Sequence, residues 1–153
     1  MLYRLPLSAI KRYTAEESKM STTSNPHNDV DMLAAGREAF VSVLTLFDLW
    51  RIGEKQKMTL LGMSKSTYFK AKSDPGSLRA TPDLLERLSY LINIHAAMRN
   101  IFSNPENIYG FVNQPNGNWV FQGLSPMEYM SVGTIASLYE TAKHFETMRG
   151  GQW

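Results

Sequence analysis

The segment that most constrains the fold of this chain is residues 54–72, EKQKMTLLGMSKSTYFKAK. Leu60 and Leu61 end a short amphipathic stretch, and Gly62 follows where the backbone can turn into the left-handed conformation that glycine tolerates best. Ser64 then offers an oxygen to the amide groups two or three residues on, which is a common way for a new helix to begin. This order of helix, glycine turn and capped basic helix predicts a helix-turn-helix.

The second helix of this motif carries the side chains that we expect to contact DNA. Its basic residues would neutralise phosphates, and its short polar residues would lie at base edges in a groove. An ordinary helical hairpin with a solvated basic face would show the same pattern, so the motif alone leaves both interpretations open. The residues predicted at DNA are Ser64, Lys65, Ser66, Thr67, Lys70 and Lys72.

The distribution of charge favours the nucleic-acid interpretation. The formal net charge of the whole chain is only +2, which is too small to indicate a polyanionic partner by itself. Residues 41–80, however, hold seven lysines or arginines and three acids, whereas residues 81–153 hold four bases and six acids. A local excess of positive charge over the motif is what phosphate neutralisation requires. The acidic remainder is expected to have another role.

Length and composition predict a folded, soluble protein. A chain of 153 residues with 43% hydrophobic residues can bury one core, or two small helical cores that share an interface. The sequence shows no apolar run of about eighteen residues and no secretory signal pattern, so we expect a cytoplasmic protein without membrane contact. It has no cysteine, and its three histidines are far apart, so we expect no metal site and no cofactor.

Helix signals predict an all-α fold, a helical bundle. Residues 1–29 are interpreted as a mobile arm and linker, residues 30–80 as the helix-turn-helix part, and residues 81–153 as a helical C-terminal part. Three helix starts repeat a capping side chain followed by proline: Thr81-Pro82, Asn104-Pro105 and Ser125-Pro126. Helices are expected at about 30–51, 82–102, 105–113, 126–130 and 132–149, with a tight turn at Asn116-Gly117 and a short extended segment at 119–121.

One expected helix carries a heptad-like apolar stripe. The stripe fits either the core of a bundle or a self-association seam across a two-fold axis, and we predict a dimer contact there. His95 within it is more typical of a hydrogen-bonded core histidine than of a catalytic base. No phosphate loop, nucleophile elbow or paired-carboxylate motif indicates an enzyme that would use His95 or His144, so we expect no catalytic residue. The stripe consists of Leu84, Leu88, Leu91, His95, Met98 and Phe102.

Several short motifs, in this order, resemble the Xre/MbcA/ParS antitoxins. They are LFDLW at 46–50, LLGMSKSTYFK at 60–70, TPDLLERLSYLINIHAAMRNIFSNPENIYGFVNQPN at 81–116 and GLSPMEYMSVGTIASLYETAKHFETMRGG at 123–151. The resemblance spans about residues 35–153. It implies an Xre-type helix-turn-helix joined to a helical domain that binds a toxin, usually a RES-domain toxin that destroys NAD.

The resemblance implies a type II antitoxin that covers the active site of its toxin with its C-terminal region and represses its own operon. We expect it to act as a homodimer or a higher oligomer. Gly150 and Gly151 are expected to cap the last helix. Trp153 would be either a frayed end or an aromatic anchor in a partner pocket. The alternative is a stand-alone helix-turn-helix repressor without a toxin. The expected toxin contacts are Tyr139, Lys143, Glu146, Arg149, Gly150, Gly151, Gln152 and Trp153.

Overall fold

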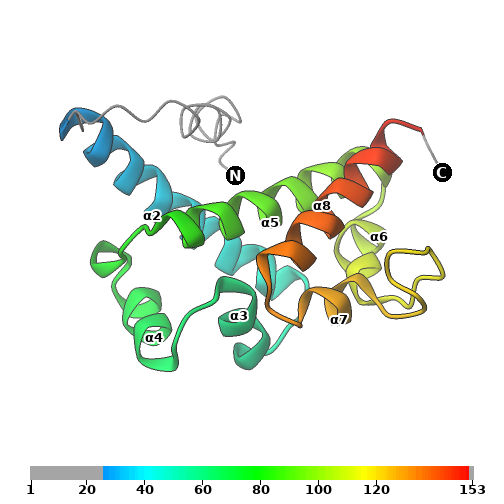
Figure 1. Cartoon of the computed structure of the whole chain (residues 1–153), viewed down its shortest axis with the longest axis horizontal. Coiled ribbons are helices and arrows are strands. Elements are labelled where there is room, and N and C mark those ends of the chain that lie inside the picture. The colour runs from blue at the N-terminus through cyan, green and yellow to red at the C-terminus, as the bar shows by residue number, and fades with distance from the viewer. Residues whose placement is uncertain (1–25, 152–153) are drawn as a thin grey trace.

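A computed structural model describes residues 26–151, and all of their regular secondary structure is helical (Figure 1). The all-α prediction is therefore confirmed for this range. The first half holds the long helix α2 (Pro26–Leu49), the short helices α3 (Glu54–Leu61) and α4 (Lys65–Ser73), and a 3-10 turn, η1 (Pro75–Ser77). The second half holds α5 (Pro82–Ile101), α6 (Pro105–Gly110), η2 (Phe111–Asn113), α7 (Pro126–Met130) and α8 (Ile135–Arg149).

Two predicted helix starts are shifted in the structure. α2 begins at Pro26, so the last four residues of the segment 14–29, predicted to be a linker, are helical. The remainder of the predicted arm, residues 1–25, lies outside the described residues. α8 begins at Ile135 and not at 132, because Gly133 adopts a left-handed φ of 82° and Thr134 caps the helix. The predicted proline-opened helices begin where expected.

α2 contributes an apolar stripe to the core and packs against α5. The stripe consists of four large side chains that are completely buried: Phe40, Val43, Phe47 and Trp50. They lie three or four residues apart, so they share one helix face. Burying four large apolar side chains stabilises the fold by roughly 2 kcal/mol for each, before the cost of ordering the chain. This stripe anchors the long helix under the helix-turn-helix.

α5 and α8 lie side by side and run in the same direction (Figure 1). The rings of Tyr90, in the middle of α5, and Tyr139, in the second turn of α8, are 5.8 Å apart between centroids. Near their ends, Phe111 lies between Phe102 and Phe145, with centroid distances of 4.9 and 5.9 Å. Because two parallel helices cannot be joined by a short turn, α6, η2 and α7 return the chain to the start of α8.

The heptad-like stripe of α5 lies in the intramolecular core. His95 and Phe102 are half-buried, and the His95 ring stacks on that of Tyr109 with a centroid distance of 5.6 Å. Because these side chains pack within one chain, the structure favours the alternative of a bundle core over the predicted dimer contact. The other four stripe residues are at most 4% exposed: Leu84, Leu88, Leu91 and Met98.

The segment 119–121 forms a turn and not the predicted extended segment. The Asn116 amide donates to the Leu124 carbonyl and closes a loop, within which the Phe121 amide donates to the Asn118 carbonyl. An extended segment needs a neighbouring strand for its amides, and residues 26–151 contain none, so the loop satisfies its amides locally. The Asn118 amide also donates to the side chain of Asn116, which confirms the turn predicted at that position.

Arg87 fastens α3 to the α5–α8 pair. Its side chain is 10% exposed, and its Nε lies 2.8 Å from Oδ2 of Asp83. Its Nη1 donates to the carbonyl of Leu60, at the end of α3, and to the carbonyl of Gly133, just before α8, at 3.3 and 2.9 Å. Among residues 26–151, no backbone amide in a turn, loop or cap donates to either of these two carbonyls. α5 therefore belongs to both halves of the chain and begins just after the predicted boundary at residue 80.

In the part of the chain that is described, no helix combines the length and the apolar character needed to cross a membrane.

Candidate functional site

The turn between α3 and α4 has the geometry predicted for a helix-turn-helix. Gly62 adopts a left-handed φ of 62°, and its amide donates to the Thr59 carbonyl. A Cβ at this position would also approach the Arg87 guanidinium to 2.8 Å, so glycine is required for two reasons. Ser64 is the N-cap of α4, and its Oγ accepts from the Thr67 amide at 3.4 Å. These local predictions are confirmed.

α4 has one buried side and one exposed side. Tyr68 and Ala71 are at most 2% exposed and hold the helix against the core. Lys65, Ser66 and Lys70 are exposed, and helical spacing places them away from the buried side. An exposed, basic face on the second helix of such a pair is the arrangement that enters a DNA major groove in helix-turn-helix proteins.

The other predicted DNA residues make contacts within the protein. Ser64 Oγ donates to Thr67 Oγ1 at 2.9 Å, so both exposed side chains are used at the start of α4. Lys72 Nζ lies 2.9 Å from Oε1 of Glu54, and it lies 5.9 Å from the ring centroid of Phe69. Lys72 is therefore held within the motif, whereas Lys65 and Lys70 make no ion pair with any described residue.

Lys57 is a core residue although it belongs to the basic segment. It is 5% exposed, and its Nζ lies 2.6 Å from Asp48 and 3.2 Å from Glu54. A buried ammonium needs such anionic partners. The nearby Tyr68 hydroxyl, then Lys72 and Lys57, lower the pKa of Glu54 to about 2. That hydroxyl lies beside the carboxylate without a hydrogen bond of ordinary geometry.

The segment 41–80 still has an excess of positive charge when these internal ion pairs are left out of the count. Asp48 and Glu54 are engaged with Lys57 and Lys72, so two acids and two bases are removed from the count together. Five bases stand against the one remaining acid, Asp74. A charge count along a sequence cannot distinguish bases in internal ion pairs from bases that face solvent, because it contains no information on burial. The five bases outside these ion pairs are all exposed: Arg51, Lys55, Lys65, Lys70 and Arg79.

Phe69 is an exposed aromatic residue on α4 that the sequence analysis missed. It is 40% exposed, directly after the fully buried Tyr68. The two rings meet edge to face, with centroids 5.1 Å apart and an interplanar angle of 76°. The signal was present in helical periodicity, because two successive aromatic residues on one helix cannot both face the core.

The predicted toxin contacts lie along α8 and at its end. Tyr139 is 45% exposed, and Lys143 Nζ lies 5.8 Å from its ring centroid. Arg149 Nη2 lies 3.3 Å from Oε1 of Glu146. Spacings of four and three residues place Tyr139, Lys143 and Glu146 on one exposed face of the helix. We call Tyr139, Lys143, Glu146 and Arg149 the α8 surface.

The end of α8 has the predicted pair of capping glycines. The Gly150 amide donates to the Glu146 carbonyl, and the Gly151 amide donates to the Met148 carbonyl. Gly151 adopts a left-handed φ of 78°, which is typical of a helix end. This prediction is confirmed. Gln152 and Trp153, the last two predicted toxin contacts, lie outside the described residues.

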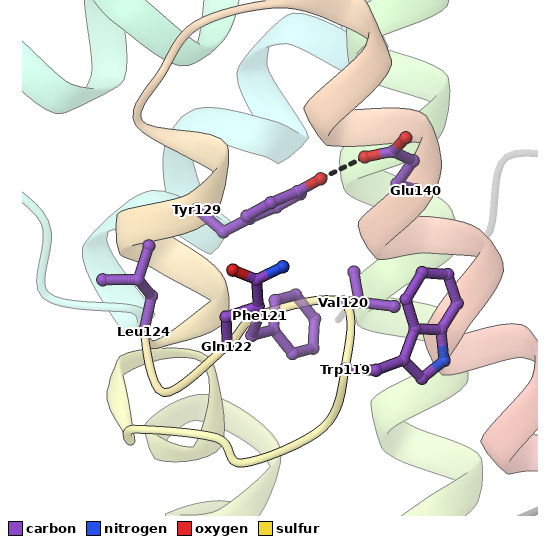
Figure 2. A pocket seen from close by; sticks show the side chains of 7 residues that line it. All are labelled: Trp119, Val120, Phe121, Gln122, Leu124, Tyr129 and Glu140. Atoms are coloured by element: carbon purple, nitrogen blue, oxygen red, sulfur yellow. Dashed lines mark hydrogen bonds between the residues drawn. The ribbon is translucent and has the colours of Figure 1, made fainter.

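A surface with several aromatic and aliphatic residues lies beside α8, and the sequence analysis did not predict it. The loop before α7 forms a pocket of ≈ 270 Å³ (Figure 2). Trp119 is 83% exposed at its edge, and the Tyr129 hydroxyl donates to the Glu140 carboxylate of α8. Residue type alone cannot separate an exposed tryptophan from a core one. We call the lining of this pocket the Trp119 surface; it consists of Trp119, Val120, Phe121, Gln122, Leu124, Tyr129 and Glu140.

Neither His95 nor His144 contacts a side chain that would make it a catalytic base. Burial and the nearby Arg99 lower the pKa of His95, and its Nδ1 is buried without a hydrogen-bond partner. Burial lowers the pKa of His144, whose Nε2 lies 3.3 Å from the side-chain amide of Asn118. Between residues 29 and 151 no group of three or more His, Asp and Glu side chains could hold a metal ion.

Comparison with known proteins identifies the helix-turn-helix region. The family described as "Antitoxin Xre-like helix-turn-helix domain" matches residues 32–93, which extend from α2 into α5. The chain is also 33% identical over 129 residues to the uncharacterized protein y4oB of Sinorhizobium fredii. That alignment covers 84% of this chain and 95% of the relative. No solved structure matches the chain significantly.

Proposed function

This chain belongs to the family of proteins with an antitoxin Xre-like helix-turn-helix domain, and on that basis we propose that it is the antitoxin of a type II toxin–antitoxin pair. It binds operator DNA and thereby represses its own operon. It also binds a RES-domain toxin and covers the active site of that toxin. Both actions are binding events that need no catalytic group of this chain.

The observation that carries DNA binding is the exposed face of α4. Lys65, Ser66 and Lys70 share this face, and the buried Tyr68 and Ala71 fix its orientation on the opposite side. With α4 in a major groove, the two lysines contact phosphates and fix the position of the helix, and Ser66 contacts a base edge.

Salt dependence tests this assignment. The protein is titrated against labelled DNA from upstream of its own gene over a range of salt concentrations. Replacing Lys65 and Lys70 together by alanine is expected to weaken binding to all sequences and to lower the slope of log affinity against log salt by about two units. Ser66→Ala should instead change base preference. Unchanged affinity and slope in the double variant would show that α4 does not contact DNA.

The proposal of a RES-domain toxin rests on the C-terminal half of the sequence. The segments 81–116 and 123–151 resemble, in order and spacing, the antitoxins whose partners destroy NAD. The α8 surface and the neighbouring Trp119 surface together offer exposed aromatic rings and charges on one side of the molecule, and aromatic residues often anchor protein interfaces. We propose that this side, with the C-terminal residues, binds the toxin.

Co-expression tests the toxin partner. The gene adjacent to this one is expressed with and without the antitoxin, and growth, cellular NAD and co-purification are measured. Rescue of growth and NAD, with the toxin in the purified complex, is the expected result. The protein would instead be a stand-alone repressor if it binds operator DNA but neither co-purifies with the product of the neighbouring gene nor restores growth.

We also propose that two copies bind a two-fold operator with half-sites about 34 Å apart, or a multiple of that distance. Because the stripe of α5 is core, the contact between copies lies elsewhere on the molecule. The mass of the protein with and without operator DNA, measured by light scattering, tests this point. One copy for each operator would contradict it.

A further inference from the structure

Phe69 lies in the middle of the face of α4 proposed to enter the major groove. At about 100° for each residue, its side chain leaves the helix between those of Lys65 and Ser66. All three are exposed, and the buried Tyr68 and Ala71 lie on the other side of the helix. A groove that receives the lysines must therefore also receive the Phe69 ring.

The ring is held in place by its neighbours. Tyr68, which is fully buried, meets it edge to face at 5.1 Å between centroids. The Lys72 ammonium lies 5.9 Å from the ring centroid, and this ammonium is itself fixed by its ion pair with Glu54 at 2.9 Å. Held between a core tyrosine and an ion-paired lysine, the exposed ring is pre-organised for contact and little side-chain entropy remains to be lost.

We infer that Phe69 is a specificity-determining residue that packs against the 5-methyl group of thymine in the operator. This inference rests on the proposed DNA binding by α4. Among the groups displayed in the major groove, the thymine methyl is the apolar one, and a phenylalanine ring has no hydrogen-bonding atom for the others. Stacking on a base would require an unpaired strand, whereas a methyl contact needs only intact B-form DNA.

The test removes the methyl group from the DNA and leaves the protein unchanged. Thymines in the upstream DNA are replaced by deoxyuridine, first throughout one strand and then one at a time, and affinities are measured by fluorescence anisotropy at fixed salt. Wild-type protein is expected to lose about fourfold in affinity at the contacted thymine, which corresponds to about 0.8 kcal/mol for one buried methyl-sized group.

The variant Phe69→Ala completes the test. It should bind thymine and deoxyuridine DNA equally, at the level of wild type on deoxyuridine DNA or below, and should keep its salt slope. Val132→Ala, which shortens another exposed apolar side chain (70% exposed) in the loop before α8, is the control and should discriminate like wild type. Circular dichroism confirms that both variants are folded.

Two results would overturn the inference and leave DNA binding intact. In one, wild type binds with the lysine-dependent salt slope but shows no loss at any deoxyuridine. In the other, Phe69→Ala still binds thymine DNA more tightly than deoxyuridine DNA, which would mean that another group of the protein contacts the thymine methyl. If wild type shows no salt-dependent binding to the upstream DNA at all, the proposed DNA function fails and the inference fails with it.

Discussion

The ammonium of Lys57 lies 2.6 Å from the carboxylate of Asp48, beneath the helix-turn-helix and not at its surface. The lysine is 5% exposed, whereas the Asp48 side chain is 72% exposed, so the pair lies at the boundary between core and solvent. A residue that adds to the positive charge of the DNA-binding segment in the sequence thus acts in the structure as a tie between α2 and α3.

Lys57→Met is therefore expected to reduce the free energy of unfolding by about 1 to 2 kcal/mol. Methionine keeps the apolar stem but leaves the Asp48 carboxylate without its charged donor, whereas Glu54 keeps its ion pair with Lys72. The exposure of Asp48 moderates the loss. Urea unfolding followed by circular dichroism gives the value. Lys55→Met, at an exposed position on the same helix, is the matched control and should change stability by less than about 0.5 kcal/mol. Equal effects of the two substitutions would contradict a structural role for Lys57.

The salt slope of DNA binding is expected to separate Lys70 from Lys72. Lys70→Ala removes an exposed cation on the proposed DNA face and should lower the slope by about one unit. Lys72→Ala removes a cation that already pairs with Glu54, so its effect on the slope should be clearly smaller. Anisotropy titrations of both variants against the same duplex provide the comparison. A larger change for Lys72 than for Lys70 would show that the Glu54 pair opens when DNA binds.

Gly62→Ala should destabilise the protein by about 1 to 2 kcal/mol or more. The left-handed φ of 62° strains any residue with a Cβ, and this Cβ would also meet the Arg87 guanidinium at 2.8 Å. Gly110→Ala is the control, because its φ is −90° and nothing lies within 4 Å of the added atom; it should be neutral or slightly stabilising. Thermal melts of the two variants decide the point, and a stable Gly62→Ala protein would argue against this turn.

Acid should remove the contribution of Glu54 to stability. Its pKa in the folded protein is lowered to about 2 from an ordinary value of 4.5, so it stabilises the fold fully above about pH 4.5. That contribution is lost as the pH falls from 4.5 toward 2. The difference in unfolding free energy between wild type and Glu54→Gln should therefore be largest near neutral pH and shrink at pH 3. A difference that stays constant over this range would show that the carboxylate is not responsible.

The toxin-binding side can be divided by two changes that leave the helices intact. Deleting Gln152 and Trp153 keeps the Gly150 and Gly151 amides that cap α8, so stability and operator binding should be unchanged. Trp119→Ala removes the most exposed aromatic ring of the described residues. If either group anchors the toxin, its loss should weaken neutralisation by about thirtyfold or more, since a buried aromatic anchor is worth about 2 kcal/mol.

Growth and cellular NAD on co-expression with the toxin give the measurement. Val132→Ala, exposed in the loop between α7 and α8, controls for nonspecific effects of shortening a surface side chain. Full rescue by the deletion and by Trp119→Ala together would leave Tyr139, Lys143 and Glu146 of α8 as the remaining contact.

The parts of the fold that follow local rules were predictable from the sequence. The side chains of Ser64 and Thr81 accept from amides three residues on, and Gly62 adopts a left-handed φ that glycine tolerates best. The turn and these helix starts therefore follow from residue type and immediate neighbours. The roles of Lys57 and Leu91 were not predictable in this way. Whether a lysine is paired, or a leucine faces its own chain or another, depends on residues brought together by the tertiary fold.

Phe69 and Trp119 show the same limit for the candidate sites. Both are large apolar residues in segments that also contain a fully buried aromatic residue, and type alone does not reveal which of the two faces solvent. For Phe69 the helical period could have decided between them. For Trp119 no helical or strand period indicates which ring is exposed. The loop that exposes it is instead closed by a hydrogen bond from the Asn116 amide to the Leu124 carbonyl.

The bond network of Arg87 determines how this protein could be recombined with its relatives. A graft of residues 30–80 would carry Leu60 into a foreign scaffold without the arginine that satisfies its carbonyl. A graft that extends through residue 101 would bring donor and acceptor together. The recipient would then have to match the loop carbonyl supplied by Gly133 and the side chains of α8 that pack against α5. If α4 contacts the operator as proposed, the smallest unit that could be exchanged is therefore the helix-turn-helix together with the whole of α5. Exchange at the predicted boundary before α5 would remove the Arg87 bond to Leu60 and is expected to give less stable chimaeras.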